Sequence, residues 1–168
     1  MKDKSVMKQK VKYSVVPTIL FSCLIVFLGI MASRFMDKGE PGFFYGMSFA
    51  LCICFLSALF YVPVAISVYD RRLRVHRLLF KKDIPLSGIE SIRLCPPTMG
   101  ERRLCGSGGF FGYWGWFSER DLGRYFAYYG KASDCFLVTL KSGRKYMLGC
   151  ENPEKIVDFV RSHTATAV

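Results

Sequence analysis

The chain has 168 residues and a formal net charge of +11, with 24 Lys and Arg residues against 13 acidic residues. Beside any membrane segment, this length leaves room for one small domain and excludes a second globular one. The seven cysteines include no C-x-x-C pair, so the sequence indicates neither a metal site nor a redox motif, and we expect no cofactor. Their scattered spacing is typical of a reducing compartment.

Two long uncharged stretches follow a basic N-terminal segment. The first covers residues 13–33, and the second runs from 41 to 69 without any Asp, Glu, Lys or Arg. About 20 helical residues cross a hydrocarbon core roughly 30 Å thick. We therefore expect two transmembrane helices, at 13–33 and 43–64, that form a hairpin around a short external loop, 34–42.

The charges that flank these stretches predict how the hairpin is oriented. Residues 1–12 carry five lysines and one acid, and six Lys or Arg residues lie between Arg71 and Lys82. The loop between the stretches has two basic and two acidic residues. By the positive-inside rule, the basic tail 1–12 and the C-terminal part both face the cytoplasm. The predicted location is the cytoplasmic (inner) membrane, crossed twice.

Beyond the second stretch the hydrophobic period changes from helical to strand-like. Pro63 is expected to end the helix, because proline removes a backbone donor and restricts the residue before it. Leu73 and Val75 alternate with basic residues, which indicates a strand with one buried face, and Ile66 and Val68 predict the strand before it. Further strands are expected at 88–95, 124–129, 136–141 and 144–148, the last two joined by a Ser142-Gly143 turn.

A single amphipathic helix is predicted near the end of the sequence. Asn152 suits the N-cap position and Pro153 the first helical position. The apolar side chains at Ile156 and Val160 are four residues apart and therefore share one helical face. Residues 164–168 are expected to form a frayed tail.

Five segments after the two stretches form a pattern that resembles a known family. They are Val68-Tyr69-Asp70-Arg71-Arg72-Leu73-Arg74-Val75, Ile84-Pro85-Leu86, Ile89-Glu90-Ser91-Ile92, Arg103–Gly115, and Asn152-Pro153-Glu154. With these segments, residues 65–163 resemble the bacterial pleckstrin-homology-like (PH) domains, and specifically their membrane-anchored members. The resemblance implies a mainly β, partly open barrel with one C-terminal α-helix and generally no enzymatic activity. The phosphoinositide binding of eukaryotic PH domains is not part of it.

The most unusual segment, which we call the glycine-aromatic stretch, runs from Gly106 to Phe117 and interleaves five glycines with six aromatic residues. It is not a Walker loop, because no Gly-Lys-Ser/Thr follows, and Phe111 interrupts a dinucleotide-binding fingerprint. Three interpretations stay open: a loop with special backbone angles whose aromatic side chains fill the barrel or touch the bilayer; a surface that inserts into lipid or contacts another copy; and a phosphate site made of backbone amides. The candidate interaction residues are Gly106, Gly108, Gly109, Phe110, Gly112, Trp114 and Trp116.

Basic residues that follow the second stretch are candidates for an anionic lipid surface. Near an anionic leaflet, each such side chain contributes on the order of 1 kcal/mol to membrane binding. The alternative is that these charges only fix the topology of the hairpin. The candidates are Arg71, Arg72, Arg74, Arg77, Lys81 and Lys82.

No pattern in the sequence indicates catalysis. His76 and His163 lie far apart, and Cys105 has no recognisable base nearby in the sequence. The spans contain no Asp, Glu, Lys, Arg or His, which argues against a transporter, and the dispersed basic residues argue against nucleic-acid binding. We expect a membrane-anchored interaction module that binds a membrane protein partner, another copy of itself or an anionic lipid surface. The alternative is an accessory subunit of a membrane enzyme or transporter.

Overall fold

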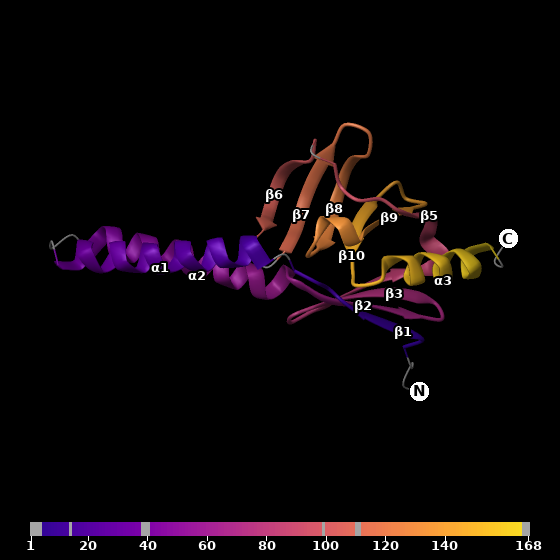
Figure 1. Cartoon of the computed structure of the whole chain (residues 1–168), viewed down its shortest axis with the longest axis horizontal. Coiled ribbons are helices and arrows are strands. Elements are labelled where there is room, and N and C mark those ends of the chain that lie inside the picture. The colour runs from indigo at the N-terminus through magenta and orange to yellow at the C-terminus, as the bar shows by residue number, and fades with distance from the viewer. Residues whose placement is uncertain (1–4, 14, 38–40, 99, 110–111, 166–168) are drawn as a thin grey trace.

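The molecule consists of a rod of two helices that projects from a β-rich domain (Figure 1). The structure is a computed structural model, and it describes residues 5–13, 15–37, 41–98, 100–109 and 112–165. The rod contains α1 (Val15–Asp37) and α2 (Pro41–Tyr61), which lie side by side. Both helices therefore extend into the loop that was predicted at 34–42. Pro41 opens α2 because its missing N–H would have no helical partner at that position.

The sequence predicted that these two helices cross a membrane. In the part of the chain that the structure describes, no helix is both long and apolar enough to do so. The second helix ends at Tyr61 rather than at residue 64, because Pro63 already belongs to a strand. Two membrane-crossing helices are thus not found among the described residues.

A four-stranded sheet follows the rod. Its order is β1 (Met7–Lys10), β2 (Pro63–Tyr69), β3 (Arg72–Arg77) and β4 (Lys81–Pro85), and all neighbours are antiparallel. β2 and β3 confirm the strands predicted around Ile66 and Leu73. β1 corrects the prediction that residues 1–12 form only a tail, because Met7–Lys10 pairs with β2. The helical rod is therefore inserted between two strands that pair with each other.

A second, six-stranded sheet forms the rest of the domain, in the order β5-β9-β10-β8-β7-β6. All its neighbouring strands are antiparallel except β8 and β10, which are parallel. The strands are β5 (Ile89–Leu94), β6 (Arg102–Gly109), β7 (Gly112–Glu119), β8 (Gly123–Tyr129), β9 (Cys135–Leu140) and β10 (Lys145–Gly149), with short 3-10 turns at Leu86–Gly88 and Ala132–Asp134. Here β5, β8, β9 and β10 confirm the predicted strands, whereas β4, β6 and β7 were not predicted as strands.

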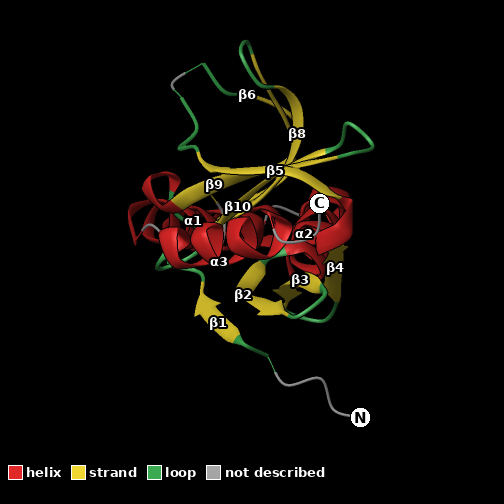
Figure 2. Cartoon of the chain, turned by 90° about the vertical axis from the view of Figure 1, so that its right-hand side faces the viewer, coloured by secondary structure: helices red, strands yellow, loops and turns green. Residues whose placement is uncertain are grey.

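The main hydrophobic core lies between the two sheets, and α3 (Pro153–Ala165) closes one open side of it (Figure 2). Ile156 and Val160 of α3 are fully buried, as their helical spacing predicted. Among the described residues the two sheets share no strand pairing, so the expected barrel takes the form of two open sheets packed together. A second cluster, which includes Tyr125 and Tyr129, is buried on the opposite face of the six-stranded sheet.

The strand directions define two ends of the domain. Pro63 follows α2 and pairs with Arg77, so the β3–β4 turn lies at the end that carries the rod, which we call the helix-side end. Tyr69 pairs with Arg72, so the β2–β3 turn lies at the far end. The seven residues of β2 separate these ends by about 20 Å, at roughly 3.3 Å per residue.

Candidate functional site

The structure divides the basic candidates between the two ends of the domain. Arg71 lies in the β2–β3 turn and Arg72 opens β3, so both are at the far end. Arg77 ends β3, and Lys81 and Lys82 open β4, so these three lie at the helix-side end. Closeness to the helices in sequence therefore did not predict closeness in space, because β2 carries the chain away from the rod before β3 returns.

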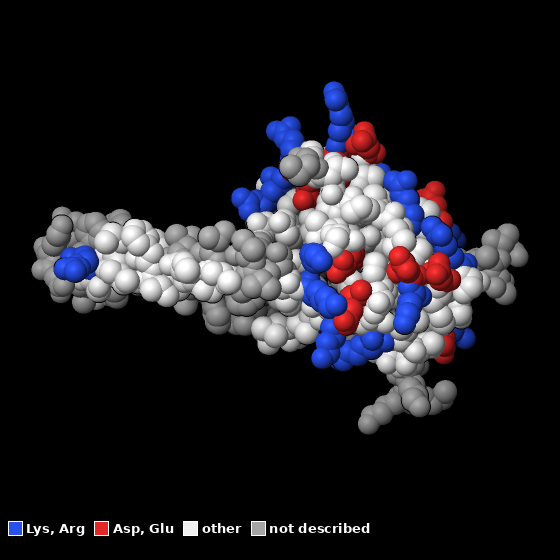
Figure 3. Space-filling view, in the orientation of Figure 1, with Lys and Arg blue, Asp and Glu red and all other residues white. Residues whose placement is uncertain are grey.

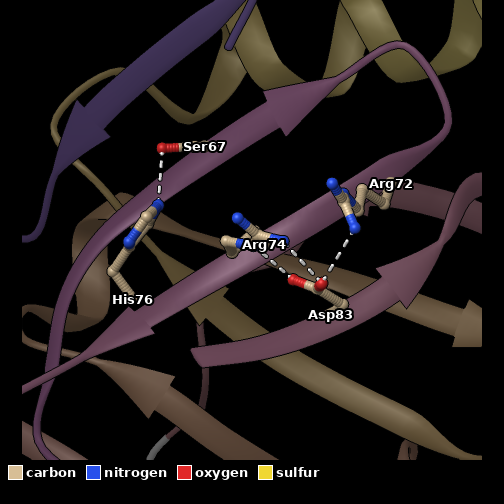
Figure 4. Close-up of polar contacts among 5 residues, drawn as sticks. All are labelled: Ser67, Arg72, Arg74, His76 and Asp83. Carbon is tan, nitrogen blue, oxygen red and sulfur yellow. Dashed lines mark hydrogen bonds and ion pairs between the residues drawn. The ribbon is translucent and has the colours of Figure 1, made fainter. Parts of the chain in front are cut away.

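Arg72 and Arg74 form an ion-paired group with Asp83 of the neighbouring strand (Figure 4). Arg74 donates from Nε and Nη2 to the two carboxylate oxygens at 2.5 and 2.7 Å, and Arg72 Nη1 lies 3.4 Å from Oδ2. The two guanidinium groups also lie over the ring of Tyr69, at 5.4 Å for Arg72 and 4.9 Å for Arg74. The hydrogen bond from Arg74 holds the pKa of Asp83 below its usual value.

His76 lies on the same face of the sheet, and its Nε2 is 2.9 Å from Ser67 Oγ (Figure 4). Burial lowers the pKa of His76, and the positive charges of Lys8, Lys81 and Arg74 act in the same direction. Ser67 is only 1% exposed, so its hydroxyl is covered. The Ser67–His76 pair is therefore a structural contact within a basic sheet face to which β1 contributes Lys8.

Arg77 is partly buried, and its guanidinium lies among aromatic rings. Its guanidinium lies 5.8 Å from the ring centre of Tyr61 and 6.0 Å from those of Phe80 and Tyr128. Its Nε is buried and has no hydrogen-bond partner in the described structure. Cation–π contacts of this kind stabilise a positive charge beside an aromatic ring. Arg77 therefore helps to fix the end of α2 against the core.

The β3–β4 turn carries three consecutive exposed apolar residues, Leu78, Leu79 and Phe80, which we call the apolar turn. Their exposed fractions are 54%, 58% and 50%. Phe80 stacks on Phe60 of α2, with ring centres 5.4 Å apart, so the turn lies against the base of the rod. Lys81 and Lys82 follow directly. This turn was not predicted from the sequence, although three adjacent apolar residues at a position where a polar turn is expected are a signal for it.

The glycine-aromatic stretch forms most of the β6–β7 hairpin, so the loop of the first interpretation is wrong, whereas its special backbone angles are confirmed by the positive φ of Gly106 and Gly115. Its two tryptophans differ in environment. Trp114 is 8% exposed and stacks on Tyr61 of α2 at 5.5 Å, whereas Trp116 is 46% exposed and meets Phe126 edge-on at 5.2 Å. The indole N–H of Trp114 is buried without an acceptor in the described chain. One tryptophan therefore joins the core and the other remains at the surface.

Close backbone packing explains two of the glycines in this hairpin. Gly106 and Gly115 face each other across β6 and β7, with φ of +125° and +122°. A Cβ on Gly106 would lie 2.1 Å from the carbonyl oxygen of Trp114, and one on Gly115 would lie 2.2 Å from that of Cys105. Side chains other than glycine are therefore excluded at both positions. Gly108, Gly109 and Gly112 lie nearer the turn of the same hairpin, and Phe110 lies outside the described residues.

An open cavity of about 710 Å³ lies where α2 meets this hairpin. Ser57 and Tyr61 line it from α2, Trp114 and Trp116 from β7, and Phe126 from β8. β6 contributes the remaining wall, including Arg103, the one charged residue among the lining residues that the structure describes.

Figure 3 shows how charged side chains are distributed over one face of the molecule. Lys and Arg lie over the β domain and at the tip of the rod, whereas the described sides of the rod carry none. No group of three His, Cys, Asp or Glu residues that could hold a metal ion occurs in the described part of the chain. Burial raises the pKa of Cys150 to about 12 and that of Cys135 still further above its usual value. These thiols therefore remain protonated at neutral pH.

The β domain matches a known protein family. Residues 64–164 match the family model described as Bacterial PH domain, a range that runs from β2 into α3. No curated protein and no solved structure matches the chain significantly. The matched range excludes β1 and the helical rod.

Proposed function

This chain belongs to the bacterial PH domain family, and on that premise we propose that it is an interaction module anchored in a lipid bilayer, whose β domain rests its helix-side end on an anionic lipid surface. In this proposal the rod inserts into the cytoplasmic membrane, and both ends of the chain lie in the cytoplasm. The module binds rather than catalyses. The observation that carries the proposal is the arrangement of apolar and basic side chains at the helix-side end.

The rod displays apolar side chains on its outside. Ile19, Val26 and Phe27 of α1 are 57%, 61% and 56% exposed, and Tyr45 and Phe49 of α2 are each 68% exposed. Contiguous exposed apolar surface of this kind marks a membrane or protein contact. A bilayer is the environment that removes it from water over the whole length of the rod.

The base of the rod continues this pattern with basic residues added. The apolar turn stacks on α2 through Phe80 and Phe60, and Lys81 and Lys82 stand beside it. When the rod is embedded in a bilayer, the three residues of the apolar turn would enter the lipid–water interface, and the lysine ammonium groups would meet lipid phosphates. Two lysines near an anionic leaflet contribute on the order of 2 kcal/mol. The rod confines the domain near the membrane, which raises its effective concentration there and makes a weak surface contact sufficient.

Membrane insertion is tested by alkaline carbonate extraction of membranes that contain the full chain. We expect the chain to remain in the membrane pellet. A variant in which a short Gly-containing turn joins Val11 to Val64 lacks the rod but retains the paired ends of β1 and β2, and it should move to the supernatant. Extraction of the full chain by carbonate would contradict the proposal, whatever the behaviour of the variant.

Contact with the anionic surface is tested by hydrogen exchange of the full chain in nanodiscs. Amides of the apolar turn should be better protected in discs that contain phosphatidylglycerol than in phosphatidylcholine discs. The K81Q/K82Q double variant should lose most of this difference. The matched control is K141Q/R144Q in the β9–β10 turn, which the strand directions place at the far end of the six-stranded sheet. Equal protection of the apolar turn in both lipids would reject the lipid contact.

A protein partner is a second candidate, favoured by the free edge of the six-stranded sheet. β6 is the last strand of that sheet, and Leu104 on it is 52% exposed. Exposed edge strands pair readily with a strand from another chain. The partner would be a membrane protein, another copy of this chain, or the catalytic subunit of a membrane enzyme or transporter. Cross-linking at β6 in native membranes, abolished by L104P, would support this candidate.

A further inference from the structure

The cavity between α2 and the β6–β7 hairpin has an apolar wall formed largely by aromatic side chains. Tyr61, Trp114, Trp116 and Phe126 supply their rings to it. Its volume of about 710 Å³ falls within the range of sites that bind small molecules, roughly 300 to 1,000 Å³. The surface contact proposed above does not use it.

The backbone itself keeps this space open. Gly106 and Gly115 line the cavity, and at both positions a Cβ would collide with the opposite strand. No larger side chain can therefore fill the cavity from these two positions without moving the hairpin. Gly108, a third lining glycine, borders the guanidinium of Arg103, whose Nη1 would lie 3.1 Å from a Cβ there.

The charge at the cavity is a single cation. Arg103 is exposed, and it makes no hydrogen bond or ion pair with the described residues. Among the described residues that line the cavity, none is acidic. A guanidinium group binds phosphate through two parallel hydrogen bonds. The chemistry of the cavity therefore matches a molecule with an apolar body and an anionic phosphate.

The position of the cavity indicates where such a molecule comes from. Ser57 and Tyr61 belong to the last part of α2, so the cavity wall continues into the surface of the rod. We propose that the cavity binds one anionic phospholipid from the surrounding bilayer, with an acyl chain against the aromatic wall and the phosphate held by Arg103. This inference rests on the proposed function, because only an embedded rod places lipid at this level. Trp116, half exposed at the cavity, has the amphipathic ring that favours the lipid interface.

The test uses the full chain in nanodiscs with phosphatidylglycerol that carries a photoreactive diazirine on its acyl chain. Phosphatidylcholine with the same modified chain is the reference. After irradiation, mass spectrometry of peptides should find phosphatidylglycerol concentrated on the peptides that contain Tyr61 and Trp116. R103Q should lower this labelling about tenfold, which corresponds to one charge-assisted contact, and should leave phosphatidylcholine labelling unchanged. R102Q, which removes the neighbouring exposed charge outside the cavity, is the matched control. It should change the labelling by neither lipid.

A second variant tests the apolar part of the site. Cys105 lines the cavity and is exposed, so C105F should occupy the space and abolish the labelling of its wall by both lipids. If C105F does not fold, the labelling of R103Q still tests whether the cavity binds an anionic phospholipid. Unchanged labelling in R103Q, labelling spread evenly along the rod, or cross-links between two copies at the cavity would each overturn the inference. A chain that resists carbonate extraction but shows no labelled cavity would reject this inference alone, whereas an extracted chain would reject the proposed function as well.

Discussion

At the scale of single residues, neighbouring members of the glycine-aromatic stretch have different structural roles. Its composition marks it as unusual, and the structure assigns separate roles to its members. Gly106 and Gly115 permit two strands to approach closely, Trp114 joins the core, and Trp116 remains half exposed. The stretch is therefore both a structural hairpin and one wall of a cavity.

The glycine pair leads to a stability prediction. G115A places a methyl group 2.2 Å from the carbonyl oxygen of Cys105 at a positive φ, so we expect a loss of about 3 kcal/mol in the free energy of unfolding. G123A is the matched control: its φ is also positive, at +70°, but a Cβ there meets open space. It should cost only about 1 kcal/mol. Thermal unfolding in mild detergent measures both, and equal losses would show that the close approach carries no cost.

The Arg74–Asp83 ion pair gives a prediction about pH. Because Arg74 lowers the pKa of Asp83 in the folded state, the pair stabilises the fold above the ordinary aspartate pKa of 3.8, and this stabilisation is lost as the pH falls through the lower folded-state pKa. D83N should therefore destabilise the chain at pH 7 by about 0.5 to 1 kcal/mol, a small value because both side chains are partly exposed. The difference from the unmodified chain should shrink below about pH 4. A loss in D83N that stays the same from pH 7 to pH 3 would contradict the ion pair as its cause.

At the scale of elements, a helix or strand could be predicted where its apolar residues follow a regular pattern in the sequence. β2, β3, β9 and β10 have alternating or continuous apolar residues, and α3 has both a capping sequence and a helical period, so each was predicted near its observed bounds. The strands β6 and β7 were not predicted, because their glycines contribute no hydropathy signal. The strand β1 was not predicted either, because a segment of four residues with two lysines becomes a strand only by pairing with β2, more than fifty residues later in the sequence.

The same limit applies to the candidate site. Sequence order suggested that all six basic candidates lie near the rod, and strand direction places only Arg77, Lys81 and Lys82 there. The cavity could not be predicted, because its lining residues come from α2 and three different strands. Which side chains meet across a sheet depends on non-local register, and one sequence does not show that register.

A prediction for β1 follows from its pairing. Deleting residues 2–10 removes β1 and leaves β2 as an exposed edge, so the amides of β2 that face β1 should exchange with solvent at least about tenfold faster. The variant K8Q/K10Q keeps the strand and removes only its two exposed charges, and its exchange should remain that of the unmodified chain. If both variants behave alike, the lysine charges rather than the strand pairing stabilise this edge.

At the scale of the whole molecule, the rod projects from the helix-side end of the domain, so the far end lies on the side away from the rod. In the proposed orientation, a bilayer around the rod would meet the apolar turn and the surface near Trp116 at its boundary. The far end, with Arg71 and Arg72, then points away from the lipid. In that orientation the far end would face the aqueous phase.

The orientation can be measured by tryptophan fluorescence. The chain has two tryptophans, so W114F leaves Trp116 as the single reporter. In nanodiscs, lipids brominated near the headgroup should quench Trp116 more strongly than lipids brominated at the end of the acyl chain, because the indole ring favours the interface. Quenching by aqueous iodide alone, with none from either lipid, would show that the helix-side end does not touch the bilayer.

The insertion of the rod between β1 and β2 also has a mechanical consequence. Both connections leave the sheet at the same end, where Val11 donates to the carbonyl of Val64 at 3.0 Å. A force that pulls the rod straight away from the domain loads both strands along their length, so many hydrogen bonds must shear together. A force that separates α1 from α2 would instead open the β1–β2 pair one bond at a time. Lys12 resists that opening through its ion pair with Glu151, at 2.9 Å. The sheet thus keeps the two helices together at their base, even without strong attraction between them.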